Sequence, residues 1–390
     1  MTPDQQQLLH TTYHHFFALS PDAQRLQLER FKGICALYGY EGFLRLQNAH
    51  LVLLGTGGVG SWVAECAART GVGTISLVDF DTIELSNTNR QLHTLNSTLG
   101  QSKAETLAKR LRDINPFIHV TPYTVQLTKD NAAQLLAQFI GSTEEALLHA
   151  QESDLHAIPA PEDLAQGKRE VLYSKLTAAL QGAPVSVLQG APVSVLQGAP
   201  VSALQGVNAS AAPDTAPSSS TTKAHSYQQP AGIAPNIYAV DAIDDLWAKA
   251  TCVNLLHRAH IPVVTSGGAG GRIDPTQVHL GDVATATGDQ LMKRLRTELR
   301  RNYGYPKGEE TMASHLQKKQ VPDHKLRFNI LCSYSTEEPQ HAPQANATGL
   351  TPAQWGESEA PALPSFGAAM CVTATAGLHL ASVIIRWIVG

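Results

Sequence analysis

Residues 51–90 carry the feature that most constrains this chain: an apolar run, a glycine-rich turn, a helical stretch and a second apolar run that ends in an acid. The apolar runs are Leu51–Leu54 and Ile75–Val78, and the acid is Asp79. The glycines of the turn are Gly55, Gly57, Gly58 and Gly60. This strand–turn–helix–strand order is the context in which such glycines predict a nucleotide site, because the turn lets backbone approach phosphates and the helix N-terminus favours anions. We expect Asp79 to accept hydrogen bonds from ribose hydroxyls.

The glycine pattern alone favours NAD or FAD, but the polar residues that follow favour a triphosphate. They are Asp81, Asn87, Asn89, Arg90 and Lys103. A guanidinium grips phosphate oxygens in two places and a lysine supplies a point charge, whereas hydride transfer needs neither. An NAD-dependent oxidoreductase or a simple NAD-binding module remains a rival interpretation, against which Arg90, Lys103 and Asp244 count.

These motifs resemble the ubiquitin-activating-enzyme-like (ThiF–MoeB) superfamily of ATP-dependent adenylating enzymes. The matching pieces are GTGGVGS, VDFDTIELSNTNRQ, GQSKAE, INP and VDAIDD. Within that superfamily the chain resembles the tRNA threonylcarbamoyladenosine dehydratases, through RFKGICALYG, VVTSGGAGGRIDPTQV, CSYSTE and FGAAMCVTATAG. The resemblance covers most of residues 25–140 and 236–390.

The resemblance implies a ligase-type reaction with ATP and Mg²⁺. The carboxylate of threonylcarbamoyladenosine at position 37 of tRNA would be adenylated, and attack from within the same side chain would close a ring with net loss of water. Arg90 would neutralise charge at the α-phosphate with support from Lys103, Asp244 would hold Mg²⁺, and Asp79 would hold the ribose. The other nucleotide-binding candidates are Gly55, Gly57, Gly58, Gly60, Asp81, Asn87, Asn89 and Arg30.

Several of these candidates also have a structural interpretation. Arg30 either helps to hold the ATP phosphates, in the family sometimes from the partner subunit, or is a solvated arginine on a helix face. Asp244 stands where a helix N-cap is also expected, although Asp245 suits that cap better. The glycines at 267–271 are interpreted as a site wall, and the resemblance associates a monovalent cation (Na⁺ or K⁺) with this region.

The main alternative function is activation of a small ubiquitin-like or sulfur-carrier protein by adenylation. Many sulfur-carrier activators have paired CxxC motifs for zinc, and none of the five cysteines here forms such a pair. The resemblance also implies a homodimer and, as a further partner, a cysteine desulfurase or sulfur-acceptor system.

The net charge of −4 gives no global basic field, so an RNA-binding face must be a local patch. The best candidate is the predicted helix Asp289–Tyr303, on which Lys293, Arg296 and Arg300 share one face. A solvated basic face is the alternative interpretation. We predict no DNA partner.

The alternation of strand and helix predicts an α/β fold with a Rossmann-like, doubly wound, mostly parallel sheet. We expect an N-terminal helical extension at 1–29, with Ser20–Tyr38 as one helix, and a catalytic domain at 30–140 and 236–390. Residues 141–235 are predicted to be a low-complexity, disordered insertion, because they contain three tandem copies of LQGAPVS[VA] with Pro and Gly in every copy. Within this segment, residues 144–180 are compatible with one or two helices.

The chain starts without a secretory signal pattern, which predicts a cytoplasmic protein. Its apolar end, Phe366–Val389, is long enough to suggest a membrane span. Small residues dominate its first half, so a buried core helix at a dimer interface is the favoured interpretation.

Overall fold

A seven-stranded sheet organises the computed structural model, which describes residues 2–152, 154–155, 157–180, 230–307, 327–340 and 367–390. The strand order is β3-β2-β1-β4-β5-β7-β6, and every neighbouring pair is parallel except β6 with β7. The strands are β1 His50–Leu54, β2 Thr74–Val78, β3 His119–Tyr123, β4 Ile237–Asp241, β5 Val263–Ser266, β6 Val278–Asp282 and β7 Leu331–Ser335. The prediction of a mostly parallel, doubly wound sheet is confirmed.

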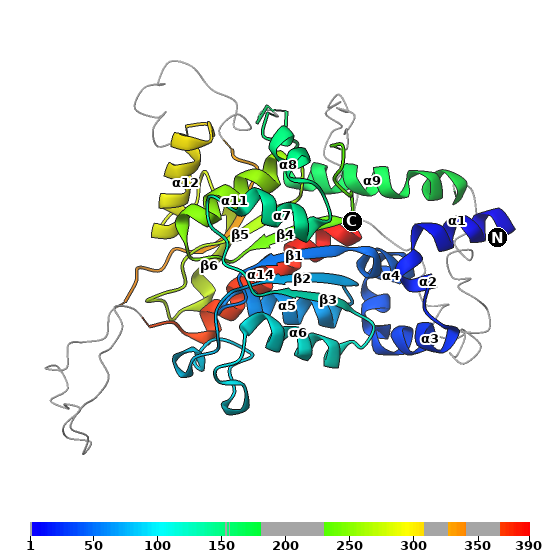
Figure 1. The fold of residues 1–390 in the computed structure, drawn as a ribbon, viewed down its shortest axis with the longest axis horizontal. Helices are drawn as coiled ribbons and strands as arrows, with labels where there is room; N and C mark the ends of the chain where they lie inside the picture. The colour runs from blue at the N-terminus through cyan, green and yellow to red at the C-terminus, as the bar shows by residue number, and fades with distance from the viewer. Residues whose placement is uncertain (1, 153, 156, 181–229, 308–326, 341–366) are drawn as a thin grey trace, which may run out of the picture.

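Helices cover both faces of this sheet (Figure 1). They are α1 Pro3–Thr12, α2 His14–Phe17, α3 Pro21–Arg30, α4 Lys32–Asn48, α5 Gly60–Thr70, α6 Lys103–Ile114, α7 Ala132–Ile140, α8 Glu144–Ala150, α9 Pro161–Leu180, α11 Leu246–Arg258, α12 Gln290–Asn302 and α14 Met370–Val389. Alternate residues of β1 enter different cores: Leu51 and Leu53 pack with α5, α6 and α14, while Val52 and Leu54 pack with α7, α8 and α11. Burial on both faces explains why the strand sequences are continuous apolar runs.

The strand order places a topological switch point between β1 and β4. From β1 the chain moves outward through β2 and β3, and after β4 it moves the other way to β5. Ligands bind at such a point, outside the carboxyl ends of the strands, because the loops on the two sides diverge and leave a crevice.

The N-terminal region departs from the prediction of one helix over Ser20–Tyr38. Ser20 caps α3 by accepting a hydrogen bond from Ala23 N, as its sequence suggests, but α3 ends at Arg30. Phe31, with φ −110° and ψ 20°, separates α3 from α4, and Gly39, at φ 71°, kinks α4. The break lets Phe31 pack against the Phe43 ring, with centroids 5.6 Å apart, in a small apolar core.

The segment predicted as a disordered insertion is partly folded. Helices α8 and α9 lie inside 141–235, and their Leu147, Ala165 and Lys168 are fully buried. The tandem repeats fall in 181–229, outside the described residues. Lys168 has no hydrogen-bond partner among the described residues, and burial lowers its pKa to about 7. Apolar packing, together with hydrogen bonds from Arg169 to Trp387 O and from Gln5 to Ala179 O, holds α9 in place.

The C-terminal helix α14 is part of the core. By length and composition it could cross a membrane, but 67% of its most apolar 18-residue window is buried inside the protein. It packs along α5, where the position of a Cβ added to Gly377 would lie 2.5 Å from the Val59 oxygen and 3.0 Å from Trp62 Cβ. The favoured interpretation, a buried core helix, explains its small residues.

This close approach predicts the effect of a single methyl group. Gly377→Ala should lower the free energy of unfolding by about 1–3 kcal/mol, because the helices must separate to admit the side chain. Gly33→Ala is the matched control: Gly33 is an exposed α4 residue with no heavy atom within 4 Å of the added Cβ. The control should be neutral or stabilising by up to about 1 kcal/mol. Urea unfolding of both variants measures the difference, and equal effects would contradict the packing described.

Candidate active site

A cleft of about 820 Å³ opens at the carboxyl ends of the strands, at the switch point. Its walls come from the loops after β1, β2, β3, β4 and β5 and from the segment before α14. Most of the site residues predicted from the sequence line it: Gly55, Gly57, Gly58, Asp79, Asp81, Asn87, Asn89, Arg90, Lys103 and Asp244. The structure thus brings together residues that are up to 189 positions apart in the chain.

The glycine turn after β1 is packed directly against the turn after β4. Gly55 has φ 86°, which favours glycine, and a Cβ on it would lie 2.7 Å from the Ala242 oxygen. A Cβ on Gly60 would lie 1.9 Å from the Gly55 oxygen, so α5 begins in direct contact with the strand end. Gly57 lines the cleft with only the end of the Gln91 side chain within 4 Å of its Cβ position. This leaves backbone room for an anion at the start of α5.

Asp79, at the end of β2, holds the glycine turn with one oxygen. Its Oδ2 accepts hydrogen bonds from Thr56 N (2.7 Å) and Thr56 Oγ1 (2.9 Å), and its Oδ1 accepts one from Asp81 N (3.0 Å). A carboxylate offers about four acceptor positions. Asp79 therefore keeps acceptor capacity for a ribose hydroxyl while its orientation is fixed by the turn.

Arg90 and Lys103 are the two cations that line the cleft within the described residues. The Arg90 side chain lies over the glycine turn, within 3.3 Å of the Cβ position of Gly58, and donates to Ser86 O and Asn89 Oδ1. The Lys103 ammonium is almost fully buried and pairs with Asp81 at 2.6 Å. Arg90 is held by neutral oxygens only, so its charge is available to an anionic ligand.

Asn87 and Asn89 shape the loop that carries Arg90. Asn87 is buried and accepts a hydrogen bond from Glu84 N, while Asn89 donates to Ala368 O just before α14. Both line the cleft, but these hydrogen bonds are structural.

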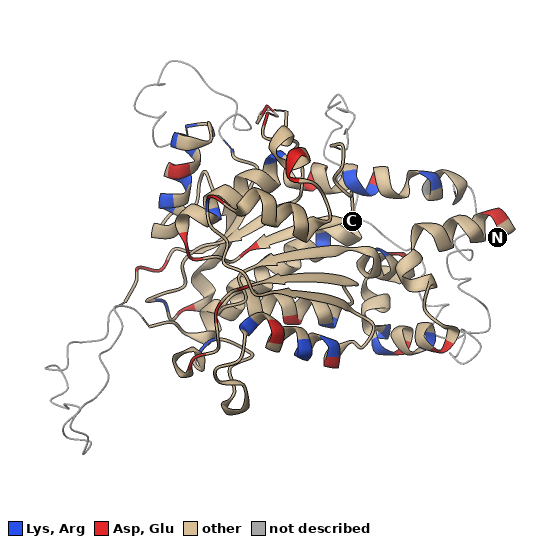
Figure 2. Cartoon of the chain, in the orientation of Figure 1, with Lys and Arg blue, Asp and Glu red and all other residues tan. Residues whose placement is uncertain are grey.

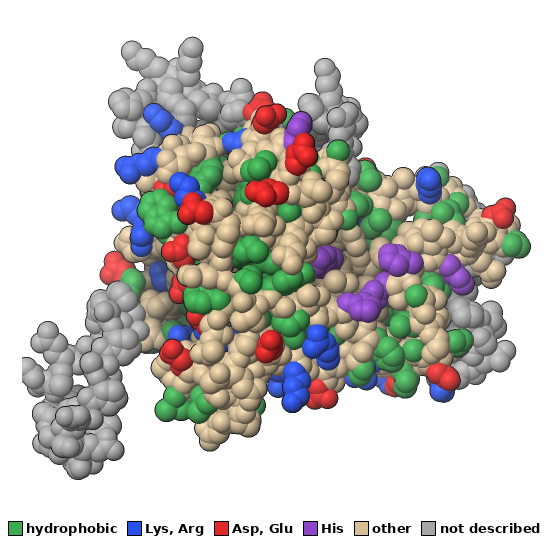
Figure 3. All heavy atoms as spheres, viewed as in Figure 1, with side chains coloured by type: hydrophobic (Ala, Val, Ile, Leu, Met, Phe, Trp, Pro, Cys, Tyr) green, Lys and Arg blue, Asp and Glu red, His purple; other side chains and the backbone are tan. Residues whose placement is uncertain are grey.

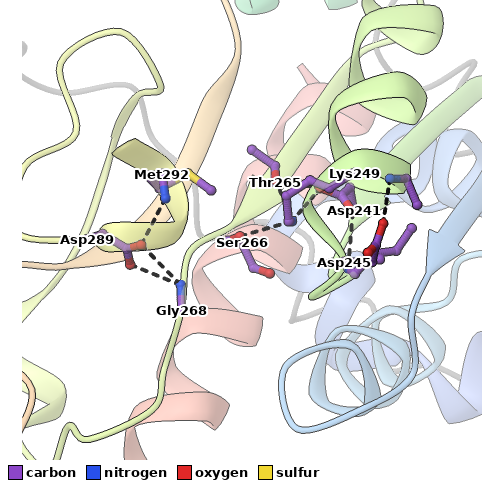
Figure 4. Close-up of polar contacts among 10 residues, drawn as sticks. Asp241, Asp245, Lys249, Thr265, Ser266, Gly268, Asp289 and Met292 are labelled. Carbon is purple, nitrogen blue, oxygen red and sulfur yellow. Dashed lines mark hydrogen bonds and ion pairs between the residues drawn. The ribbon is translucent and has the colours of Figure 1, made fainter. Parts of the chain in front are cut away.

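The acids after β4 have separate roles (Figure 4). Asp245 caps α11 by accepting from Ala248 N at 2.8 Å, as its position in the sequence suggests. Asp244 is exposed in the cleft and makes no hydrogen bond or ion pair within the described part of the chain. Asp241, three residues before Asp244, is fully buried and does not line the cleft.

Asp241 and Lys249 form a buried ion pair behind the cleft (Figure 4). Their contact is 2.6 Å, and neither side chain is exposed. Thr265 donates to the same carboxylate oxygen at 2.5 Å, and the ammonium donates to Ser266 O at 3.1 Å. Because every charge is hydrogen-bonded, the pair ties the ends of β4 and β5 to α11.

A second buried acid fixes the glycine segment after β5. Asp289 caps α12 by accepting from Met292 N, and its other oxygen accepts from Gly268 N at 3.0 Å (Figure 4). A Cβ on Gly267 would collide with this carboxylate, at 2.3 Å. Arg272 lies 3.6 Å from Asp289 and donates to Gly268 O. The glycine segment is a rigid cleft wall, in keeping with its interpretation from the sequence.

The sequence did not single out the apolar part of the cleft. It consists of Phe80, Val125, Leu127 and Ile243, with Phe80 51% exposed. The alternation of apolar residues after β3, at Val125 and Leu127, was the sequence signal that could have predicted this wall. His93 was also missed: burial lowers its pKa to about 4, and the neighbouring Lys103 acts in the same direction. The imidazole of His93, next to the Lys103 charge, is therefore neutral.

Besides Gly60, which begins α5 beneath the glycine turn, four predicted residues lie outside the cleft. Arg30 donates to Ile114 O at 2.7 Å on the surface. Lys293, Arg296 and Arg300 do not share an exposed face: Lys293 is exposed, while Arg296 is buried and donates to the Val283 and Ala286 carbonyls. Arg300 is half-buried, 5.6 Å from the Phe328 ring centroid. The prediction of one basic face was wrong because α12 turns its Arg296 side toward the core.

The described residues contain no cluster of three or more His, Cys, Asp or Glu side chains able to hold a metal ion. A metal in the cleft would therefore need ligands from a bound molecule as well as from the protein. Mg²⁺ commonly binds in this way, through one or two carboxylates together with phosphates and water. The exposed Asp244 fits that requirement.

Comparison with known proteins gives a consistent result. Residues 32–144 match the ThiF family. The chain is 29% identical to the tRNA threonylcarbamoyladenosine dehydratase of Escherichia coli over 351 residues, 90% of this chain and 89% of that protein. The crystal structure of that E. coli enzyme in complex with AMP superposes with a TM-score of 0.57 at 28% identity and covers 95% of this chain and 96% of its own.

The similarity to carrier-protein activators is shorter. The sulfur carrier protein adenylyltransferase of Thermus thermophilus is 38% identical over 101 residues, which are 26% of this chain and 37% of that protein. The ThiF family match is confined to residues 32–144, whereas the similarity to the tRNA threonylcarbamoyladenosine dehydratase extends over nearly the full length of both proteins.

Proposed function

We propose that this protein is an ATP-dependent tRNA threonylcarbamoyladenosine dehydratase, which adenylates the carboxylate of the modified adenosine at position 37 and lets it cyclise. The observation that carries the proposal is the length of the match. The similarity to the E. coli dehydratase covers 90% of the chain in sequence and 95% in structure, whereas the match to a carrier-protein activator covers about a quarter of it. Activation of a ubiquitin-like or sulfur-carrier protein is therefore the weaker candidate.

The cleft suits ATP in one orientation. The glycine turn and the start of α5 offer backbone N–H groups to phosphates, and Asp79 lies at the strand end next to them. The apolar wall of Phe80, Val125 and Leu127 adjoins Asp79 and suits a purine ring. ATP bound this way places its α-phosphate near Arg90.

The Asp244 carboxylate would hold a Mg²⁺ ion beside the ATP phosphates. The bound ion would neutralise phosphate charge. Asp244 itself needs no rearrangement for this role, because no group of the described protein competes for its oxygens. A monovalent cation near residues 267–271 remains a prediction. The Asp289 carboxylate in this region is already engaged by Gly268 and Arg272.

The reaction that follows needs little further machinery. A carboxylate is a poor electrophile, and its oxygen attacks the α-phosphorus to release pyrophosphate. The tethered nucleophile of the same side chain then attacks the acyl carbon and releases AMP, with the large effective molarity of an intramolecular reaction. Arg90 would stabilise the charge that develops at the α-phosphate in both steps, and the buried Lys103–Asp81 pair would support it.

The RNA-facing surface is proposed to be the outer side of α12, with a different residue set from that predicted. Lys293, Arg294 and Arg301 are exposed there, and basic side chains gather along this helix at one edge of the molecule (Figures 2 and 3). The helix begins at the cleft wall, since Asp289 holds Gly268. Phosphates of an RNA whose modified nucleotide enters the cleft would therefore meet this edge.

The remaining assignments belong to the same proposal. The protein would work in the cytoplasm as a homodimer, with Arg30 contributed to the cleft of the partner subunit, and with a cysteine desulfurase or sulfur-acceptor system as a further partner. The exposed stripe of α14, which includes Leu378 at 45% exposure, gives such a dimer a surface.

Turnover with defined substrates tests the function. AMP and pyrophosphate should form only with tRNA that carries threonylcarbamoyladenosine, and the product nucleoside should be lighter by one water. Arg90→Ala should lower kcat/KM by about 10²–10³-fold, because it removes a group that acts on developing charge. Asp244→Asn should raise the Mg²⁺ concentration needed for half-maximal activity by about 10–100-fold.

Asp113→Asn, at an exposed α6 position outside the cleft, is the matched control and should behave as wild type. AMP formation that depends on a small carrier protein instead of modified tRNA would contradict the proposal and support the alternative.

Salt dependence tests the RNA surface. The double variant Lys293→Ala, Arg294→Ala should bind tRNA more weakly and reduce the slope of log K against log salt by about 1.4–1.8, because two phosphate contacts are lost. Arg25→Ala, Lys32→Ala removes two exposed cations from the opposite end of the molecule and should leave the slope unchanged (Figure 1). An unchanged slope in the first variant would exclude α12 as the contact surface.

A further inference from the structure

An exposed tryptophan, Trp247, lies in the first turn of α11, two residues after Asp245, which lines the cleft. Trp247 is 50% exposed, although Leu246 before it and Ala248 after it are buried. Leu246 packs into the apolar cluster between α11 and α12, and Trp247 follows it about 100° further around the helix, on a side open to solvent. The half-exposed indole leaves a large π-face available to a ligand.

The backbone of Trp247 is held rigidly. Asp245 caps the first turn of α11 through Ala248 N, and the Trp247 oxygen accepts a hydrogen bond from Thr251 Oγ1 at 3.0 Å. Thr251 Oγ1 also lies 2.7 Å from the Tyr303 hydroxyl at the end of α12. The indole is thus presented on a fixed frame and not on a loop.

Trp247 and two cations flank the same side of the cleft. Asp245, two residues before Trp247, lines the cleft, and so does Leu291 in the first turn of α12. Lys293 and Arg294 stand two and three residues after Leu291 and are exposed. Asp289 ties the start of α12 to Gly268 in the cleft wall, which places the two helix starts beside the same opening (Figure 4).

We propose that Trp247 is a stacking platform for an unpaired base of the RNA substrate that neighbours the reacting nucleotide, with Lys293 and Arg294 on the adjoining phosphates. A π-face beside cations is the arrangement by which proteins hold single-stranded nucleic acid. The reacting nucleotide must enter the cleft, so the bases next to it in the loop reach the rim where Trp247 stands. This inference rests on the proposed function and names a contact for its substrate.

Binding of an anticodon stem-loop RNA to the full-length protein, measured without turnover, tests the platform. Trp247→Ala should weaken binding by about 5–100-fold, and Trp247→Phe, which keeps a π-face, by about 3-fold or less. ATP affinity and the melting temperature should be unchanged in both variants. Leu37→Ala, which truncates a 73% exposed side chain on α4, is the matched control and should bind as wild type.

Two further measurements distinguish base stacking from nonspecific RNA binding. RNA should quench tryptophan emission in the wild type and much less in Trp247→Phe, and a fully paired RNA of the same length should not compete. Wild-type affinity in Trp247→Ala, or competition by the paired RNA at equal strength, would overturn the proposal. Binding that depends on Trp247 in a protein that makes no AMP with modified RNA would retain the platform and refute the dehydratase function.

Discussion

The contact between the turns after β1 and β4 is the constraint on which the site depends. Gly55 and Gly60 have no room for a side chain, because the Ala242 and Gly55 oxygens occupy the Cβ positions. This contact closes the base of the switch-point crevice and sets Asp244 opposite the glycine turn and Arg90. Two buried acids extend the same frame: Asp241 secures β4 and β5 through Lys249, and Asp289 secures the glycine wall and α12.

The cleft combines the cations Arg90 and Lys103 with five carboxylates of the described chain. Lys103 is paired with Asp81, and Asp79 is engaged by the glycine turn, so neither depends on a ligand to be stable. Arg90 and Asp244 make no ion pair within the described chain, and the proposed function assigns them to phosphate and to Mg²⁺. Burial and the neighbouring Lys103 charge lower the pKa of His93, which does not line the cleft, and keep its imidazole neutral.

The sequence predicted the sheet, its direction and most of the cleft, because these depend on local signals. The strand runs are apolar on both faces, and Gly55, Asp79 and Asp245 have conformations or hydrogen bonds that follow from their neighbours in the chain. It failed where tertiary packing decides. Helical spacing alone could not show that Arg296 faces the core, that Phe31 interrupts the N-terminal helix, or that α9 docks on the body with Lys168 buried. The antiparallel edge strand β6 carries too weak an alternation to be distinguished from a loop.

The chemistry proposed for the cleft predicts the fate of one oxygen atom. If the substrate carboxylate attacks the α-phosphorus of ATP, one carboxylate oxygen must leave with AMP when the ring closes. Modified RNA labelled with ¹⁸O in that carboxylate should therefore give labelled AMP and unlabelled pyrophosphate by mass spectrometry. Label in inorganic phosphate alongside ADP would show attack at the γ-phosphorus, and unlabelled AMP would show that the carboxylate is never adenylated; either result would contradict the account.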